Sequence, residues 1–96
     1  MAYVHLSKSR GISLDQYDKV LDELGSDPIT GQLLHIVGES DDTLYIVDVW
    51  QSKGHADRFA SERLFPAFAR AGVRPEPQHE DVELDATVTL GSASKG

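Results

Sequence analysis

The stretch GQLLHIVGESDDTLYIVDVWQ, residues 31–51, decides the fold. It contains two apolar runs rich in β-branched residues, 31–39 and 43–51, on either side of a short polar turn, and this spacing predicts a β-hairpin. Apolar side chains fall on both faces of the hairpin, because neighbouring residues of a strand point to opposite sides. One face carries Leu34, Ile36, Tyr45, Val47 and Val49, and the other carries Leu33, Val37, Leu44, Ile46 and Trp50.

The residues before the hairpin predict a strand and a helix. Residues 2–6 alternate in polarity as a first strand does. Ser13 and Gln16 have the spacing of a capping box, in which the serine hydroxyl accepts from a helical amide while the glutamine reaches back. Apolar residues then recur at helical spacing over 14–24, and Gly25 is expected to end this helix.

The residues after the hairpin predict a second helix and a last strand. Ser52 is expected to cap the helix, Pro66 to kink it or restart it near Phe65, and Gly72 to end it. Residues 74–77 are predicted to form an extended linker, 79–90 a strand and 91–96 a disordered tail. The stripe that this helix buries is formed by Ala56, Phe59, Ala60, Leu64, Ala67 and Phe68.

The order strand, helix, strand, strand, helix, strand is typical of a ferredoxin-like α+β fold. We therefore expect one domain over residues 1–90, with a four-stranded antiparallel sheet and two helices on one face. Two helices cover only one of the apolar faces of the hairpin. Packing of the other face against a second copy is the simplest solution, so we expect a homodimer of the dimeric α/β-barrel kind.

Composition limits the classes of partner. The 96 residues contain 9 Lys and Arg against 16 Asp and Glu, a formal charge of −7 that disfavours nucleic acid and anionic membrane surfaces. The chain has no cysteine, so disulfides, thiolate nucleophiles and cysteine-based metal centres are excluded. Its first residues do not read as a secretory signal, and a cytoplasmic location is expected.

One pair of polar residues interrupts the apolar hairpin. If the chain turns tightly at Asp41 and Asp42, His35 lies directly opposite Asp48 and Leu33 lies opposite Trp50. Such cross-strand partners are close enough for an imidazole–carboxylate hydrogen bond. A histidine oriented by a carboxylate is a usable general base, so His35 and Asp48 are the predicted catalytic residues. The same pair also suits a purely structural hydrogen bond, and a register slip of one residue would abolish it.

Aromatic and polar residues near this pair are the predicted ligand-binding residues. Trp50 suits the wall of a pocket and equally suits a core, whereas Phe59 and Tyr17 suit the core better than the pocket. His5 joins the pocket if its side chain points to the same face as that of His35, and Tyr3 then accompanies it. No metal site is predicted, because His5, His35 and Asp48 lack a diagnostic spacing. The charged residues of the last strand, predicted to form its solvated face, are His79, Glu80, Asp81, Glu83 and Asp85.

Several segments together resemble the antibiotic-biosynthesis-monooxygenase type of dimeric α/β-barrel protein. They are residues 31–38, the run 47–52 with sequence VDVWQS, Phe59, and the run 64–67 with sequence LFPA. The most specific part is the tryptophan at the strand-to-helix junction followed by an aromatic residue on the helix. The resemblance covers about residues 2–90. It implies an obligate dimer whose sheets form a barrel, and a ligand cavity between each sheet and its own helices.

The resemblance does not assign one reaction, since the same fold supports several. Cofactor-independent monooxygenases of this family, and the related haem-degrading enzymes, commonly use an Asn on the first strand and a Trp on the second helix. This chain has no Asn, Phe59 stands at the Trp position, and Ala69 stands near the position of the iron-ligating His of the haem-degrading branch. Haem degradation is therefore disfavoured. Related polyketide cyclases use His and Tyr as acid and base, and His5 matches their first-strand His.

Two main interpretations remain from the sequence. In the first, the chain is an enzyme of secondary or aromatic metabolism that needs no bound cofactor and acts on a small, flat, mostly apolar substrate. Its reaction would be a monooxygenation, or a cyclisation or isomerisation of the polyketide-cyclase kind. In the second, it is a non-catalytic dimeric module that binds a ligand or stabilises a partner. A metal-dependent activity is a third alternative, which chelation would reveal.

Overall fold

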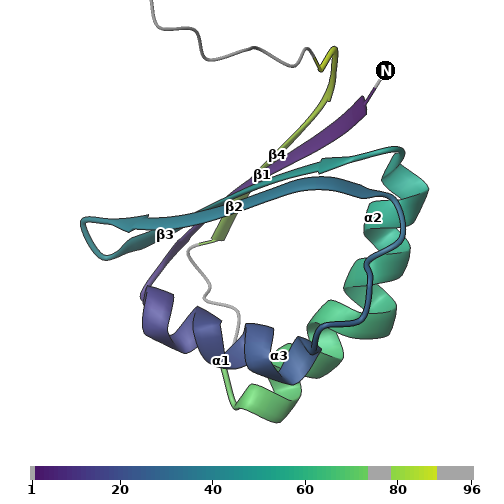
Figure 1. The fold of residues 1–96 in the computed structure, drawn as a ribbon. Coiled ribbons are helices and arrows are strands. Elements are labelled where there is room, and N and C mark those ends of the chain that lie inside the picture. Colours follow the sequence, from purple (N-terminus) through teal and green to yellow (C-terminus); the bar gives the residue numbers. More distant parts are fainter. Residues whose placement is uncertain (1, 74–78, 89–96) are drawn as a thin grey trace, which may run out of the picture.

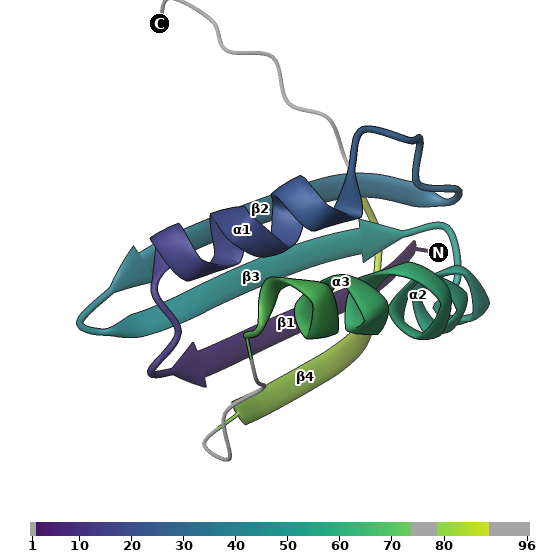
Figure 2. The ribbon, with the colours of Figure 1, turned by 90° about the horizontal axis from the view of Figure 1, so that it is seen from below.

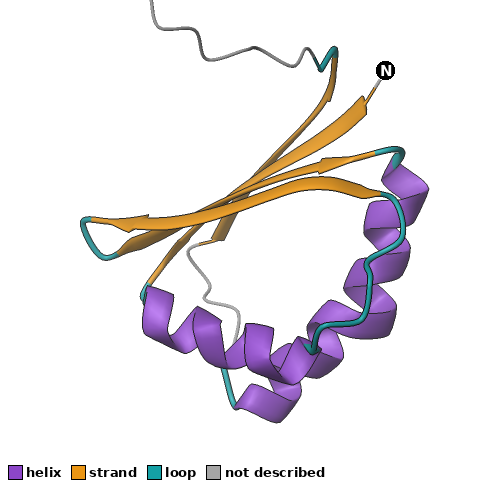
Figure 3. Cartoon of the chain, viewed as in Figure 1, coloured by secondary structure: helices purple, strands orange, loops and turns teal. Residues whose placement is uncertain are grey.

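The computed structural model describes residues 2–73 and 79–88. These residues form one four-stranded antiparallel sheet in the order β2-β3-β1-β4. The helices lie on one face of the sheet only (Figures 1 and 3). The expected ferredoxin-like α+β fold is therefore confirmed. In the described part of the chain no helix has the length and apolar character needed to cross a bilayer.

The first half of the chain follows the predicted elements with one extension. Helix α1 spans Leu14–Leu24, and both hydrogen bonds of the capping box between Ser13 and Gln16 are present. Strand β1 spans Ala2–Arg10, four residues beyond the predicted end. It continues through polar residues because β1 is a central strand, paired with β3 from Tyr3 to Arg10 and with β4 from Ala2 to Ser9. Backbone hydrogen bonds on both sides hold these residues whatever their polarity.

The hairpin is formed by β2, Gln32–Ser40, and β3, Thr43–Trp50. Asp41 and Asp42 both have positive φ, 50° and 61°, as a type I′ turn requires. The predicted pairing of His35 with Asp48 is confirmed. The predicted pairing of Leu33 with Trp50 is wrong, because a bulge next to Leu33 places Gln32 opposite Trp50. Leu33 is left exposed, and Gln32 takes its place beside the tryptophan.

The helical segment after the hairpin consists of α2, Lys53–Phe59, a π-helical turn η1, Ala60–Leu64, and α3, Phe65–Ala71. Ser52 accepts a hydrogen bond from the backbone amide of His55, as an N-cap does. Pro66 lies at the start of α3, so the predicted restart near Phe65 is confirmed. Gly72 ends α3 in the left-handed conformation, with φ of 72°.

Strand β4 spans His79–Ala86 and is shorter than predicted. Its last residue pairs with Ala2, where β1 begins, so no partner strand is available for residues 87 and 88. The linker predicted over 74–77, the final two residues of the predicted strand and the tail over 91–96 lie outside the described residues.

The core lies between the helices and the end of the sheet that contains the turn between β2 and β3. Helix α1 lies over β2 and β3, and α2 and α3 lie over β1 (Figure 2). Tyr17, Val20 and Leu44 are almost fully buried there between the two layers. The complete buried cluster is Ile12, Tyr17, Val20, Leu44, Ala67 and Val73.

Gly31 permits the close approach of α2 to the start of β2. A Cβ atom at this position would lie 2.4 Å from the imidazole ring of His55. Gly25 has nearly the same positive φ, 83° against 84°, but an added Cβ there would meet nothing within 4 Å. The two glycines therefore separate the cost of backbone strain from the cost of the contact.

We expect Gly31→Ala to destabilise the protein more than Gly25→Ala. Positive φ costs both variants on the order of 1–3 kcal/mol, and the Gly31 variant must in addition displace His55. Urea unfolding of both variants at one protein concentration measures the difference in free energy of unfolding. A further His55→Ala change should reduce the extra cost in the Gly31 variant. Equal losses for the two glycines would show that the imidazole contact is unimportant.

Candidate active site

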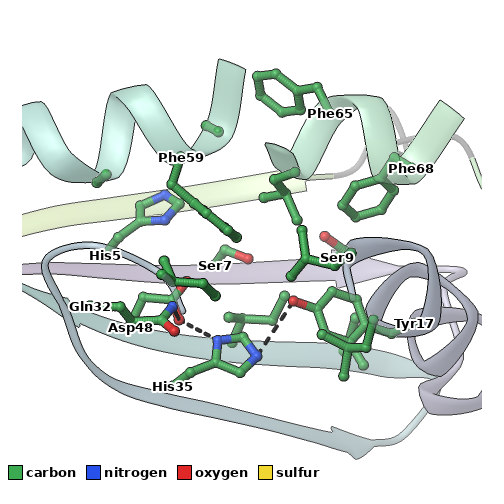
Figure 4. Close-up of a pocket in the computed structure, with 18 of the residues that line it drawn as sticks. His5, Ser7, Ser9, Tyr17, Gln32, His35, Asp48, Phe59, Phe65 and Phe68 are labelled. Carbon is green, nitrogen blue, oxygen red and sulfur yellow. Dashed lines mark hydrogen bonds and ion pairs between the residues drawn. The ribbon is translucent and has the colours of Figure 1, made fainter. Parts of the chain in front are cut away.

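A cavity of about 440 Å³ lies between the sheet and its helices. The sheet supplies the floor and the helices supply the roof (Figure 4). The roof is almost entirely apolar, whereas most of the polar groups come from the strands. The polar lining residues are His5, Ser7, Ser9, Tyr17, Gln32, His35, Asp48 and Asp81, and the larger apolar ones include Ile12, Leu21, Leu24, Ile29, Leu44, Ile46, Trp50, Phe59, Leu64, Phe65 and Phe68.

The predicted pair of His35 and Asp48 lies on this floor. Nδ1 of His35 and Oδ1 of Asp48 are hydrogen-bonded across β2 and β3. Nε2 of Gln32, also on β2, lies 3.5 Å from the same carboxylate oxygen. If the Nδ1 nitrogen carries the proton, Nε2 of His35 holds the free lone pair and faces Tyr17. This orientation of imidazole by carboxylate is the arrangement that a general base needs.

Tyr17 extends the pair into a line of three groups. Its hydroxyl lies 3.5 Å from Nε2 of His35, and its ring stacks on the imidazole with centroids 6.0 Å apart. Phe68 packs edge-on against the other side of the tyrosine. Burial raises the pKa of the Tyr17 hydroxyl, and the negative charge of Asp48 raises it further. Tyr17 is therefore a neutral hydrogen-bond donor at neutral pH, and it is both a core residue and a cavity residue.

His5 points into the same cavity, as its position on β1 allows. It pairs with Asp48 in the strand register, so His35, Asp48 and His5 form one row across three strands. Its imidazole bonds to a different carboxylate, with Nε2 lying 2.9 Å from Oδ1 of Asp81. The prediction that Asp81 only faces solvent is thus wrong. Its side chain is partly exposed but also lines the cavity, because odd-numbered residues of β4 point to the helix side.

Trp50 and Phe59 form the apolar wall at the end of the cavity next to α2. Their ring centroids are 5.3 Å apart, and both residues line the cavity. Trp50 is almost fully buried, so its ring is a core residue and a wall at the same time. Trp50 thus combines the two positions that the sequence offered as alternatives, in the core and in the wall of the cavity.

Tyr3 is not among the residues that line the cavity. Its hydroxyl donates to Oε1 of Glu83 at 2.7 Å, and Nζ of Lys53 lies 5.9 Å from the centre of its ring. Burial raises the pKa of this tyrosine, and the hydrogen bond to Glu83 raises it further. Tyr3 is thus the cross-strand partner of Trp50 but lies outside the cavity lining, in contacts between β1, β4 and α2.

Four polar residues of the cavity lining are not expected from the sequence. Ser7 and Ser9 lie beyond the first strand that the sequence predicts, but within β1, where they alternate on the same face as His5. Gln32 lies in the site because the bulge shifts the strand register, and no pattern in the sequence predicts this bulge. Asp81 is adjacent to His5 through a pairing of distant strands. Among the described residues no group of three or more potential metal ligands converges.

Comparison with known proteins gives matches only in structure. No family model matches the chain, and no curated protein sequence matches it. A protein from Chloroflexus aurantiacus is 21% identical over the full length of both chains, with a TM-score of 0.60. One from Caulobacter crescentus is 14% identical over 91% of each chain, with a TM-score of 0.71. The names of both contain the words antibiotic biosynthesis monooxygenase, given there as a provisional description.

A third solved structure carries a more specific name. SnoaB from Streptomyces nogalater, a cofactor-independent oxygenase, is 11% identical to this chain, with a TM-score of 0.66, covering 95% of this chain and 98% of its own. The TM-scores establish a shared fold, and at these low identities the likeness extends no further than the fold. The resemblance inferred from the sequence is therefore confirmed at the level of the fold, and the chain has the architecture of antibiotic-biosynthesis-monooxygenase-type proteins.

Proposed function

We propose that this chain is a cofactor-independent enzyme that removes a proton from a small, flat, mostly apolar molecule, with His35 as the base and Asp48 as the group that orients it. The observation that carries this proposal is the His35–Asp48 hydrogen bond on the floor of a largely apolar cavity. A base at this position acts on a ligand that has lost most of its hydration shell on entering the cavity. The shared fold with an oxygenase named as cofactor-independent supports the same reading.

The product depends on what accepts the electrons of the deprotonated substrate. With molecular oxygen as the acceptor, a ring CH₂ becomes a carbonyl, one oxygen atom enters the product and the other leaves as water. Without oxygen, the carbanion attacks a carbonyl of the same molecule and closes a ring, or it takes the proton back at another carbon. Proton removal is the common first step of all three outcomes, so it is the step to test first.

We also propose that the working form is a homodimer joined through the outer face of the sheet. The strand register places Ile36, Val47, Leu6 and Val82 in one row across all four strands of that face. A second row contains Leu34, Val49, Val4 and Leu84 in the same way. Four of these side chains are at least 40% exposed, and packing against a second sheet would remove them from water.

A non-catalytic binding module is the second candidate, and one contact favours it. The Tyr17 hydroxyl lies near the nitrogen of His35 that a base would use. With Asp48 on the other nitrogen, both polar atoms of the imidazole have partners, as in a structural hydrogen-bond network. In that case removal of His35 lowers the melting temperature and changes no reaction.

A ring-opening reaction tests for the base without knowledge of the natural substrate. 5-Nitrobenzisoxazole is a flat ring compound that opens when a base removes its ring C–H proton, as the N–O bond breaks to give a coloured phenolate. We expect the wild-type protein to accelerate this reaction above buffer, and His35→Ala to lose a factor of about 10²–10⁴, the usual contribution of a positioned base. Absorbance at several substrate concentrations gives kcat/KM.

His55→Ala is the matched control for this measurement. His55 is also a partly buried histidine, but it bonds to Ser52 and does not line the cavity. The control variant should keep the wild-type rate. A folded His35→Ala protein with the wild-type rate, or a wild-type protein no faster than buffer, would rule out His35 as a base and favour the binding module.

A further inference from the structure

The cavity holds two imidazole–carboxylate pairs rather than one. His35 bonds to Asp48, and His5 bonds to Asp81. His5 and His35 both occupy the row of Asp48 on the same face of the sheet, separated by the single strand β3. Two strand spacings put the backbones of the two histidines about 9.5 Å apart. The pairs therefore lie at two ends of one polar strip across the floor.

The two pairs differ in their access to water. The exposed fraction of the side chain is 13% for Asp48 and 25% for His35, but 43% for Asp81 and 31% for His5. The cavity is therefore more open to water at the pair of His5 and Asp81 than at the pair of His35 and Asp48. A flat ligand whose reacting edge meets His35 has its far edge at His5 and Asp81.

We propose that His5 and Asp81 form a second, outer subsite that binds a hydrogen-bond-donating group, such as a hydroxyl or an amine, at the far end of the ligand, and that Asp81 excludes ligands with a carboxylate or phosphate there. This inference rests on the proposed function, because it takes the reacting edge to lie at His35. It adds to that function the chemical class of the opposite end of the substrate.

The proposed selectivity depends on the charge of the pair formed by His5 and Asp81. If His5 is neutral, the pair bears the negative charge of Asp81; if His5 is protonated, the pair is neutral. In neither state does the pair offer a net positive charge to an anion. A carboxylate at this place would lose water and face another carboxylate, which is costly at short range. A hydroxyl or an amine donates its proton to Asp81 instead.

Two probes that differ only at one end test the subsite. Naphthalene-2,6-diol carries a hydroxyl at each end of two fused rings, and 6-hydroxynaphthalene-2-carboxylate replaces one hydroxyl by a carboxylate. We expect isothermal titration calorimetry at pH 7.5 to give a dissociation constant at least about ten-fold higher for the carboxylate. Turning the carboxylate probe around would not help it, because its charged end would then meet the buried Asp48.

Asp81→Asn should reduce the gap between the two dissociation constants, because the carboxylate probe should bind this variant more tightly. The dissociation constant of the diol should change by less than about two-fold, since the amide oxygen of Asn still accepts a hydrogen bond. Asp85→Asn is the matched control. Asp85 is exposed on the same strand and the same face, but it does not line the cavity, so the gap should remain.

Each result has one meaning. Equal binding of both probes by the wild-type protein, or a gap that Asp81→Asn leaves unchanged, overturns the outer subsite and leaves the proposed base untouched. If neither probe binds, the cavity does not take flat ring compounds, and the proposed function fails together with the subsite.

Discussion

Ile36→Glu is expected to convert the homodimer that we propose into a monomer. Ile36 is 51% exposed and lies in a row of apolar side chains that crosses all four strands. In a two-fold interface each substitution occurs twice, and each new carboxylate would be buried against apolar groups of the partner. Burying such charges costs several kcal/mol, so the dissociation constant should rise by a factor on the order of 10³ or more.

Sedimentation velocity over a range of protein concentrations measures this change, and circular dichroism shows whether the variant is folded. Ala69→Glu is the matched control, because Ala69 is exposed on α3, on the helix layer of the molecule. It introduces the same charge on the opposite side and should leave the dimer intact. A wild-type protein that sediments as a monomer at micromolar concentration would contradict the proposed interface.

Trp50→Ala is expected to cause the largest loss of stability of any single side-chain truncation. Trp50 is 2% exposed, and it packs against Phe59 with ring centroids 5.3 Å apart. Truncation of a buried tryptophan typically costs about 3–5 kcal/mol, because apolar burial is lost and a void remains. Here the void would merge with the cavity and remove its wall next to α2.

Urea unfolding at a single protein concentration measures the loss, since the stability of the proposed homodimer would depend on protein concentration. Trp50→Phe keeps an aromatic ring against Phe59 and should cost clearly less than the alanine change. A loss below about 1 kcal/mol for Trp50→Ala would mean that the ring is a cavity wall without a structural role.

The pairing at the centre of the site could be predicted because it depends on local chemistry. Asp41 and Asp42 tolerate the positive φ of a tight turn, and the turn sets the register that brings His35 opposite Asp48. The same local rules placed the start of α1 at its capping box and the break of the long helix at Pro66. These signals act within a few residues, so the sequence contains them in full.

Contacts between distant strands could not be predicted in this way. The meeting of His5 with Asp81 joins residues that are 76 positions apart and requires that β4 lie beside β1 in one register. The bulge that brings Gln32 to the carboxylate of Asp48 and turns Leu33 to solvent leaves no composition signal. The separation of Tyr3 from the cavity likewise follows from its hydrogen bond to Glu83 on β4.

The sequence by itself determined the order of the elements, the two apolar faces of the hairpin and the opposition of one imidazole to one carboxylate. Turn geometry, capping and side-chain alternation act over short range, so they can be read along the chain. Only the tertiary structure decided that the hydroxyl of Tyr17 lies beside His35 and that a second imidazole–carboxylate pair, His5 and Asp81, lines the same cavity. Those contacts depend on how layers and non-neighbouring strands pack, which is a property of the whole domain.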